Sequence, residues 1–567
     1  MHHSSDWRLI AAAALVLLLM AAGAVGGQQR AVGRGPGPGP GPAPGPGPGP
    51  APTTAHFLVS SHCESCHDAI VTTSGAQLLQ VDEWRRSMMR HAFVDPLWQA
   101  KVRSEMRRIP GLASFIEAKC VTCHAPMAWT EATKGGSPVK VFDDGFLDPD
   151  HPYHAIAMEG VGCTLCHQIQ DTPELGTSEG SSGNFSIADA DDPDGRWIYG
   201  QYQNPVARPM LGSTGYQAVY GAHIEESALC GSCHDLETDY VDAAGNIAST
   251  PSTRFPEQMP YTEWLYSDFG PAGSNTSCLE CHMANAGTSK ISRSPRWLGT
   301  RENVAHHPFR SENTTMLRIL DTFAGELGVS GEDLDEALTD ASEYLASGGS
   351  VQIVDAALEQ SVLEVTVRVV NHTAHKMPTS LPSRRAYLHV IVRDAAGTIV
   401  FESGRLNADH TIAGVDADAN PAAYEPHYDL ITSQDQVQVY EAIMRNVEGG
   451  LTYTLLRASG FLKDNRLLPA GLDPATAPER IRPAGACLTD EDFTGGSDEV
   501  TYRIANLTGN RYSVVVELLD QPIAYPFIRD LQTDMDDVYV ARFMRMWETV
   551  PATAEVIGET GIDVMKR

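Results

Sequence analysis

Apolar and polar positions change their spacing along the chain. Before residue 310 the periodic stretches are short. Residues 81–92 and 97–106 repeat apolar positions every three or four residues, which predicts two helices on either side of Asp95 and Pro96. Loops rich in Gly, Pro, Asp and Ser, such as 171–195, lie between these stretches and predict short helices and few strands.

Residues 312–347 show a clearer helical pattern. Apolar positions recur at steps of three and four in MLRILDTFAGELG and in GEDLDEALTDASEYLAS, which predicts two helices. Ser330 precedes an acidic first turn and is the expected start of the second helix, which should end at Gly348 and Gly349.

After Ser350 the period becomes two, as in strands. The expected strands are 351–360, 362–371, the two arms of 386–403, 501–506 and 512–520. Ala396 and Gly397 form the expected hairpin turn, and Thr533 is a candidate N-cap for a last helix to Glu548, with Asp536 three residues on. This region reads as an antiparallel sandwich.

These patterns predict an α+β chain of two domains. A mainly α-helical and loop domain should cover 55–310, and a helical connector should cover 311–349. The β-sandwich domain with its C-terminal helix should cover 350–567.

The N-terminus has the features of an export signal. Arg8 precedes the apolar run 9–25, and small residues at 22–24 offer a cleavage site, so 1–27 is either a signal peptide or an uncleaved membrane anchor. Residues 28–54 form a Pro/Gly-rich linker that lacks the three-residue period of collagen. We therefore expect an exported protein, periplasmic or at the cell surface, which stays tethered if the anchor is retained.

The charge narrows the set of partners. Asp and Glu number 72 against 41 Lys and Arg, a formal net charge of -31. A nucleic-acid partner is excluded, because phosphate binding needs a positive face. An acidic surface suits basic redox partners or cations, although it also simply keeps a protein soluble.

Cysteine spacing is the strongest chemical signal in the chain. Ten of the eleven cysteines fall in five C-x-x-C-H motifs, the attachment signal of c-type haem. The pairs are Cys63 and Cys66, Cys120 and Cys123, Cys163 and Cys166, Cys230 and Cys233, and Cys278 and Cys281; the histidines that follow them are His67, His124, His167, His234 and His282.

Each part of this motif has a chemical task. The two thiols form thioethers with the two vinyl groups of one haem, and the adjacent histidine is the proximal iron ligand. Zinc ribbons and disulfide frameworks do not require a histidine after every pair. We therefore predict five covalent haem c groups, and a small buried apolar role for the remaining Cys487.

A haem that only carries electrons needs a sixth ligand, whereas an open position invites chemistry. The candidate distal histidines are His91, His154, His223, His307 and His375. His306, His372, His62 and His151 compete with them, and Met127, Met158 or Met283 could also ligate iron, although core packing is the simpler role for each methionine.

The chain resembles the cytochrome c-554 family of multihaem cytochromes over roughly residues 56–310. The similar stretches are DEWRRSMMRHAF, CHAPM, EGVGCTLCH, CGSCHD, EWLYSDF and SCLECHM. The segment from NHTAHKMPTSLPSRRAYLHV to LLRASGFLKDNRLLPAG resembles the C-terminal domain of many exported bacterial multihaem cytochromes. The resemblance implies close haem pairs, bis-histidine ligation at most sites, electron transfer and a distal role for His91. The chain departs from the founding type, which has four haems, and some relatives keep one five-coordinate haem.

Two functional hypotheses follow. The first is an electron carrier, with no catalytic residues, that exchanges electrons with redox proteins or an extracellular acceptor; an oligomer or filament would be a special case. The second is an oxidoreductase with one open haem that acts on a small nitrogen or sulfur compound. Pentahaem nitrite reductases resemble the chain less well, because their catalytic motif ends in lysine and all five motifs here end in histidine.

Overall fold

The computed structural model describes residues 54–192, 195–329 and 334–566. The candidate signal or anchor, the linker up to residue 53 and Ser330 lie outside these described residues. No described helix is both long enough and apolar enough to cross a bilayer.

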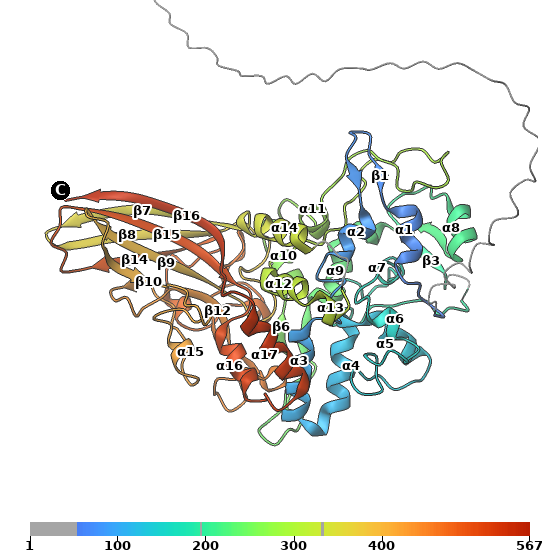
Figure 1. Cartoon of the computed structure of the whole chain (residues 1–567), viewed down its shortest axis with the longest axis horizontal. Coiled ribbons are helices and arrows are strands. Elements are labelled where there is room, and N and C mark those ends of the chain that lie inside the picture. Colours follow the sequence, from blue (N-terminus) through green and yellow to red (C-terminus); the bar gives the residue numbers. More distant parts are fainter. Residues whose placement is uncertain (1–53, 193–194, 330–333, 567) are drawn as a thin grey trace, which may run out of the picture. The chain divides into compact units, whose positions relative to one another are not determined.

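Two β-sheets dominate the C-terminal part of the chain (Figure 1). One sheet runs in the order β13 (Gly460–Asp464), β12 (Val439–Arg445), β9 (Arg385–Asp394), β15 (Arg511–Gln521) and β16 (Glu555–Met565), and β10 (Ile399–Ser403) also pairs with β9. The other sheet runs in the order β11 (Leu430–Ile431), β14 (Ser497–Ile504), β8 (Val362–Asn371) and β7 (Gly349–Glu359). All of these pairs are antiparallel except β11 with β14.

The alternating sequence explains how the two sheets pack. Every second residue of β8 is buried, including Val365 and Val367, and these side chains belong to the same apolar core as Leu388 of β9 and Val516 of β15. One face of each sheet therefore covers the other, as expected for a sandwich. The predicted α+β architecture is confirmed.

Four strands of the two sheets and one helix start were not predicted correctly. The missed strands are β11, β12, β13 and β16; β12 is buried at nearly every position, so it lacks the alternating pattern. Thr533 is not an N-cap: it ends α16 (Tyr525–Gln532), while α17 (Val538–Thr549) starts after Asp537, whose carboxylate accepts from the Tyr539 amide. The long strand β16 follows that helix, so the helix does not end the region.

The helices that precede the sandwich are short, as predicted. α3 (Pro96–Arg108) starts where expected because the Asp95 carboxylate caps it, whereas α2 (Gln80–Arg85) ends earlier than the predicted 81–92. In the connector, Phe323 separates α12 (Thr314–Thr322) from α13 (Ala324–Leu327), and α14 (Leu334–Ala346) follows.

The remaining elements are small. The helices are α1 (Ser61–His67), α4 (Ala113–His124), α5 (Pro126–Lys134), α6 (His154–Ala157), α7 (Cys163–Cys166), α8 (Ala207–Thr214), α9 (Ser227–His234), α10 (Pro260–Leu265), α11 (Cys278–His282) and α15 (Asp416–Ala419). The strand pairs are β1 (Ile70–Val71) with β2 (Gln77–Leu78), β3 (Trp197–Gly200) with β4 (Gln217–Tyr220), and β5 (Leu236–Thr238) with β6 (Phe255–Gln258).

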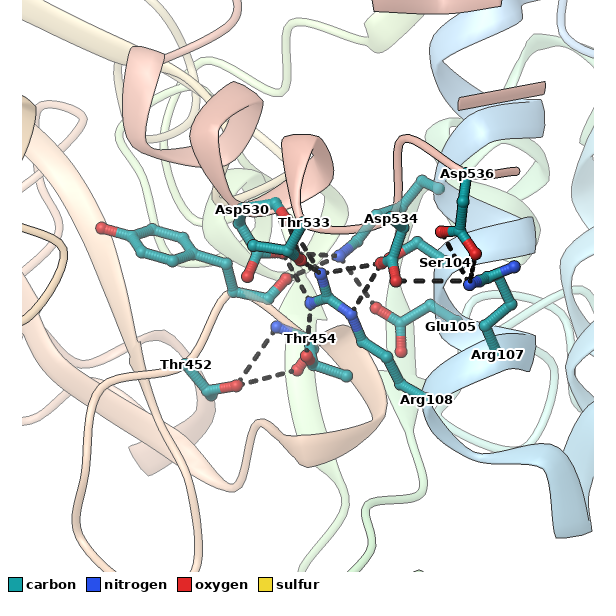
Figure 2. A network of polar contacts seen from close by, with 12 residues as sticks. Ser104, Glu105, Arg107, Arg108, Thr452, Thr454, Asp530, Thr533, Asp534 and Asp536 are labelled. Carbon is teal, nitrogen blue, oxygen red and sulfur yellow. Dashed lines mark hydrogen bonds and ion pairs between the residues drawn. The ribbon is translucent and has the colours of Figure 1, made fainter. Parts of the chain in front are cut away.

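A polar network joins α3 to the segment between α16 and α17 (Figure 2). The Arg108 guanidinium donates to the carboxylates of Asp530 at 2.7 Å and Asp534 at 2.9 Å. The Glu105 carboxylate accepts from the Leu455 amide at 2.7 Å. The C-terminal part of the chain is thereby held against α3, which packs on α4, the helix that carries the second cysteine motif.

Candidate haem-binding site

Each C-x-x-C-H motif lies on or at the end of a short helix: α1, α4, α7, α9 and α11. In a helix, positions i, i+3 and i+4 share one face. The two thiols and the imidazole of a motif are therefore presented together on that face. All ten motif cysteines are free thiols and partly exposed, whereas Cys487 is buried, as predicted.

The motifs converge on one large cavity of about 1330 Å³. All five proximal histidines line it, together with every motif cysteine except Cys120. Thioether formation needs thiols with open space beside them, and this wall provides it. The residues present therefore fit covalently attached haem.

Contacts beside the cysteines bring different motifs together. The Cys163 thiol donates at 3.4 Å to the hydroxyl of Ser60, which directly precedes α1. Ser182 joins α4 to α9, because its carbonyl accepts from Lys119 Nζ and its amide donates to the carbonyl of Asp235, which directly follows α9. The first motif thus lies against the third, and the fourth lies against both the second and the fifth. The Cys278 amide, which donates to the Ser227 hydroxyl at 3.1 Å, connects α11 to α9 independently.

Backbone carbonyls orient four of the five proximal imidazoles. Nδ1 lies 2.7–2.8 Å from a backbone carbonyl oxygen in each: Ile291 for His67, Ala92 for His124, Tyr199 for His167 and Arg310 for His282. A ligand histidine usually donates one ring N–H in this way, which leaves the other nitrogen for the metal. Among the described residues, the His234 ring has no such hydrogen bond.

Burial keeps these imidazoles neutral. It lowers the pKa of His124 and His282 to about 4, and it lowers the pKa of His67, His167 and His234 as well. The neutral ring is the form that donates a lone pair to iron. The site thus holds its histidines ready to ligate.

Two of the predicted distal histidines line the same cavity. His375 comes from the sandwich side of the chain, and its ring lies 6.4 Å from that of His282, centroid to centroid, with 22° between the planes. Two imidazoles that each place a nitrogen about 2 Å from one metal ion have centroids roughly 6 Å apart. His307 is buried on the same wall, which lowers its pKa to about 3, and His67 and His167 both lie close enough to add to that shift.

The other three predicted distal histidines do not line this cavity. His91 and His223 are fully buried, and His223 Nε2 lies 2.8 Å from the Ile169 carbonyl while its Nδ1 is buried without a partner. His154 Nδ1 lies 2.9 Å from the Phe146 carbonyl. Their ligand roles stay predictions.

Most of the competing side chains have other partners. His306 pairs with Glu83 at 2.6 Å, the exposed His372 bonds the Ser350 hydroxyl, and His151 accepts from the Tyr153 amide. Met127 is fully buried in the apolar core, and Met158 packs against it. His62 and Met283 line the cavity.

Comparison with known families agrees with this geometry. Residues 62–168, which contain the first three motifs, match the family described as cytochrome c554 and c-prime. This stretch of the chain is therefore similar to a family of multihaem c-type cytochromes. The structure of a penta-haem cytochrome c552 from Thermochromatium tepidum is similar at 16% identity and a TM-score of 0.47, covering 90% of this chain and 100% of that chain. No curated protein matches this sequence.

The sequence alone does not show how the chain holds His375 in place. The neighbouring Lys376 is buried, donates its amide to Glu263 at 2.9 Å and pairs through Nζ with Asp464 at 2.6 Å. Arg466 binds the same Asp464 carboxylate, which holds the pKa of Asp464 well below its usual range. Only the fold brings these residues together, so no local pattern announces them.

Proposed function

We propose that this cytochrome is an electron-transfer protein with five covalently attached haems, one at each C-x-x-C-H motif. Bound haem c supplies reversible one-electron chemistry at iron. The supporting observation is that all five motifs line one cavity, because neighbouring attachment points keep neighbouring groups close. The first and third motifs meet at Ser60 and Cys163, the second and fourth meet through Ser182, and the fourth and fifth meet at Ser227 and Cys278.

These contacts give the attachment sites an order. His223, shortly before the fourth motif, lies with Nε2 2.8 Å from the carbonyl oxygen of Ile169, shortly after the third motif, which connects the third motif to the fourth. The order therefore runs from the first motif through the third to the fourth, where the second and fifth both attach. The fourth motif is the junction, and the first, second and fifth are the ends.

We propose that His375 is the distal ligand of the fifth site. It faces His282 with nearly parallel rings, and its Nδ1 lies 3.1 Å from the Lys376 carbonyl, which leaves Nε2 for iron. The β-rich region would then complete an iron site whose cysteines belong to the other region.

Carbon monoxide binding to the ferrous protein tests both proposals. A carrier with every iron six-coordinate binds no CO, whereas CO binding by one haem in the native protein would favour the oxidoreductase alternative. His375→Ala should make one haem of the matured protein bind CO. His372→Ala is the matched control, because His372 lines the same cavity but its ring Nε2 bonds the Ser350 hydroxyl. If His375→Ala binds no more CO than the control, His375 is not a ligand.

We also propose that the cytochrome is exported and works in the periplasm or at the cell surface. The basic and apolar N-terminal pattern supports this, as does the site of haem attachment outside the cytoplasm. N-terminal sequencing of the mature protein, together with protease treatment of intact cells, tests it. Recovery of the full-length chain with haem in the cytoplasmic fraction would contradict it.

A further inference from the structure

Two segments of this acidic chain carry positive charge only. Residues 195–224 contain Arg196 and Arg208, and residues 284–301 contain Lys290, Arg293, Arg296 and Arg301. Neither segment contains an Asp or Glu, in a chain with 72 acidic residues and 41 Lys and Arg. Because these segments lack acidic residues in an otherwise acidic chain, their positive charge indicates a local binding role.

The fold places these two segments side by side. The Arg301 guanidinium donates to the Asn204 carbonyl at 2.7 Å and lies over the Tyr202 ring. Gln201 donates to the Asn303 carbonyl at 2.7 Å. We call the resulting surface the basic face: it consists of Lys290, Arg293, Arg296, Trp297, Arg301 and Arg208, the last in the first turn of α8 (Figure 1).

The basic face adjoins the first haem motif. The Arg293 amide donates to the Cys66 carbonyl at 2.9 Å, and its Nε donates to the Ser65 carbonyl at 2.7 Å. Ile291, two residues earlier, provides the carbonyl that orients His67. A protein bound here would therefore lie directly against the first motif, which is one end of the order of attachment sites.

The charged groups on this face are available to a partner. Arg208, Arg293 and Arg296 are exposed, and Trp297 is 70% exposed. Within the described residues, no cation of the basic face forms an ion pair: Lys290 donates to the Arg296 carbonyl, and Arg301 donates to that of Asn204. By contrast, Arg103, Arg107 and Arg108 on α3 all pair with carboxylates of the C-terminal region.

We propose that the basic face docks an acidic redox protein that exchanges electrons at the first haem site. This inference rests on the proposed electron-transfer function. Opposite charge attracts such a partner to this face, while the net charge of -31 repels it elsewhere, so the body of the protein adds to the specificity.

Stopped-flow reduction of the matured protein by photoreduced flavodoxin, an acidic one-electron donor, tests this proposal. The variant Arg208→Glu/Arg296→Glu reverses two charges on the face. The control Arg405→Glu/Arg482→Glu changes the net charge equally at exposed arginines that have no ion pair in the described structure. At low ionic strength the face variant should react about tenfold more slowly and the control nearly as the wild type, and the difference should vanish at high salt.

Other results would overturn the docking site. Equal reduction rates in the face variant and the control would rule it out. A changed haem content or reduction potential in the face variant would also rule it out, because these cations would then interact with the bound haem. Two further results would assign the face to another occupant. If the wild type pellets with phosphatidylserine vesicles and the face variant does not, while the flavodoxin rate is unchanged, the occupant is a membrane. If the wild type self-associates in sedimentation velocity and the face variant does not, again with an unchanged rate, the occupant is a second copy of the chain. Dithionite titration distinguishes failure of the docking site from failure of the proposed function. If the wild-type protein takes up no electrons from dithionite, the proposed electron-transfer function itself is wrong.

Discussion

The motif-bearing region and the β-rich region are held together in different ways. In the sandwich, long strands bury side chains such as Val367, Leu388 and Val516 against one another. In the motif-bearing region, short helices line a cavity of about 1330 Å³. The sandwich is held by its apolar core alone, whereas the motif-bearing region combines an apolar core around Met127 with a space that covalent groups must fill. The stability of the motif-bearing region should therefore depend on haem attachment, whereas the stability of the sandwich should not.

The largest expected effect comes from withholding the haem groups. In a chain produced without cytochrome maturation, amide hydrogen exchange in α1, α7, α9 and α11 should accelerate at least about 100-fold, because those helices lose their packing partners. Exchange in β8, β9 and β15 should stay within about threefold of the matured protein. A uniform acceleration across both regions would show that the sandwich depends on haem as well.

The second expected effect is confined to the sandwich. Leu388→Ala removes a fully buried side chain between the two sheets, which should lower the free energy of unfolding by about 4 kcal/mol. The haem absorption spectrum should not change, because Leu388 lies outside the cavity wall. Denaturant unfolding followed by circular dichroism, with the Soret band as a second probe, checks this. A parallel change of the Soret band in native buffer would contradict the separation of the two regions.

The third effect comes from a difference between buried acids. Asp464 has two cationic partners, whereas Glu257 beside the second motif only accepts from the Thr238 hydroxyl, and burial raises the pKa of Glu257 to about 7. The folded state therefore keeps a proton on Glu257 that the unfolded chain releases near pH 4.5. The contribution of protonated Glu257 to the free energy of unfolding is fully present below pH 4.5 and is lost as the pH rises through 7.

Glu257→Gln should remove this loss. Between pH 4.5 and 8 the wild type should lose up to about 3 kcal/mol more unfolding free energy than the variant. Glu364→Gln, which changes an exposed carboxyl on β8, is the control and should retain the wild-type slope. Chemical denaturation at a series of pH values measures the difference, and identical slopes in all three proteins would exclude Glu257 as the cause.

The smallest effect concerns the contact between the regions. Arg108→Ala removes hydrogen bonds to Asp530 and Asp534 and should lower the free energy of unfolding by about 2 kcal/mol. It should also separate the unfolding of the sandwich from that of the motif-bearing region in differential scanning calorimetry. Arg107→Ala is the matched control on the same helix; its pair with Asp536 is exposed, so little change is expected. Equal destabilisation by both variants would refute a special role for Arg108.

The sequence predicted those features that depend on local pattern. The strict alternation of residues 362–371 placed β8 to the residue, and Asp95 with Pro96 marked the start of α3. β12 escaped because a strand buried on both faces loses its alternation, and Thr533 misled because two helices meet near it. At the candidate haem site, spacing alone predicts the roles of the thiols and of the histidines that follow them. The facing of His375 and His282, and the support that Lys376 receives from Glu263, require the fold.

The closeness of the first and third motifs also bears on the biogenesis of the protein. Cys63 and Cys163 lie 100 positions apart in the chain, yet the Cys163 thiol donates to the hydroxyl of Ser60, three residues before Cys63. A chain that folded before ligation in an oxidising compartment would bring these two thiols near each other, where a disulfide would consume two attachment points at once. Haem attachment must therefore either precede the folding of this region or take place in the presence of a reductant that keeps the two thiols reduced.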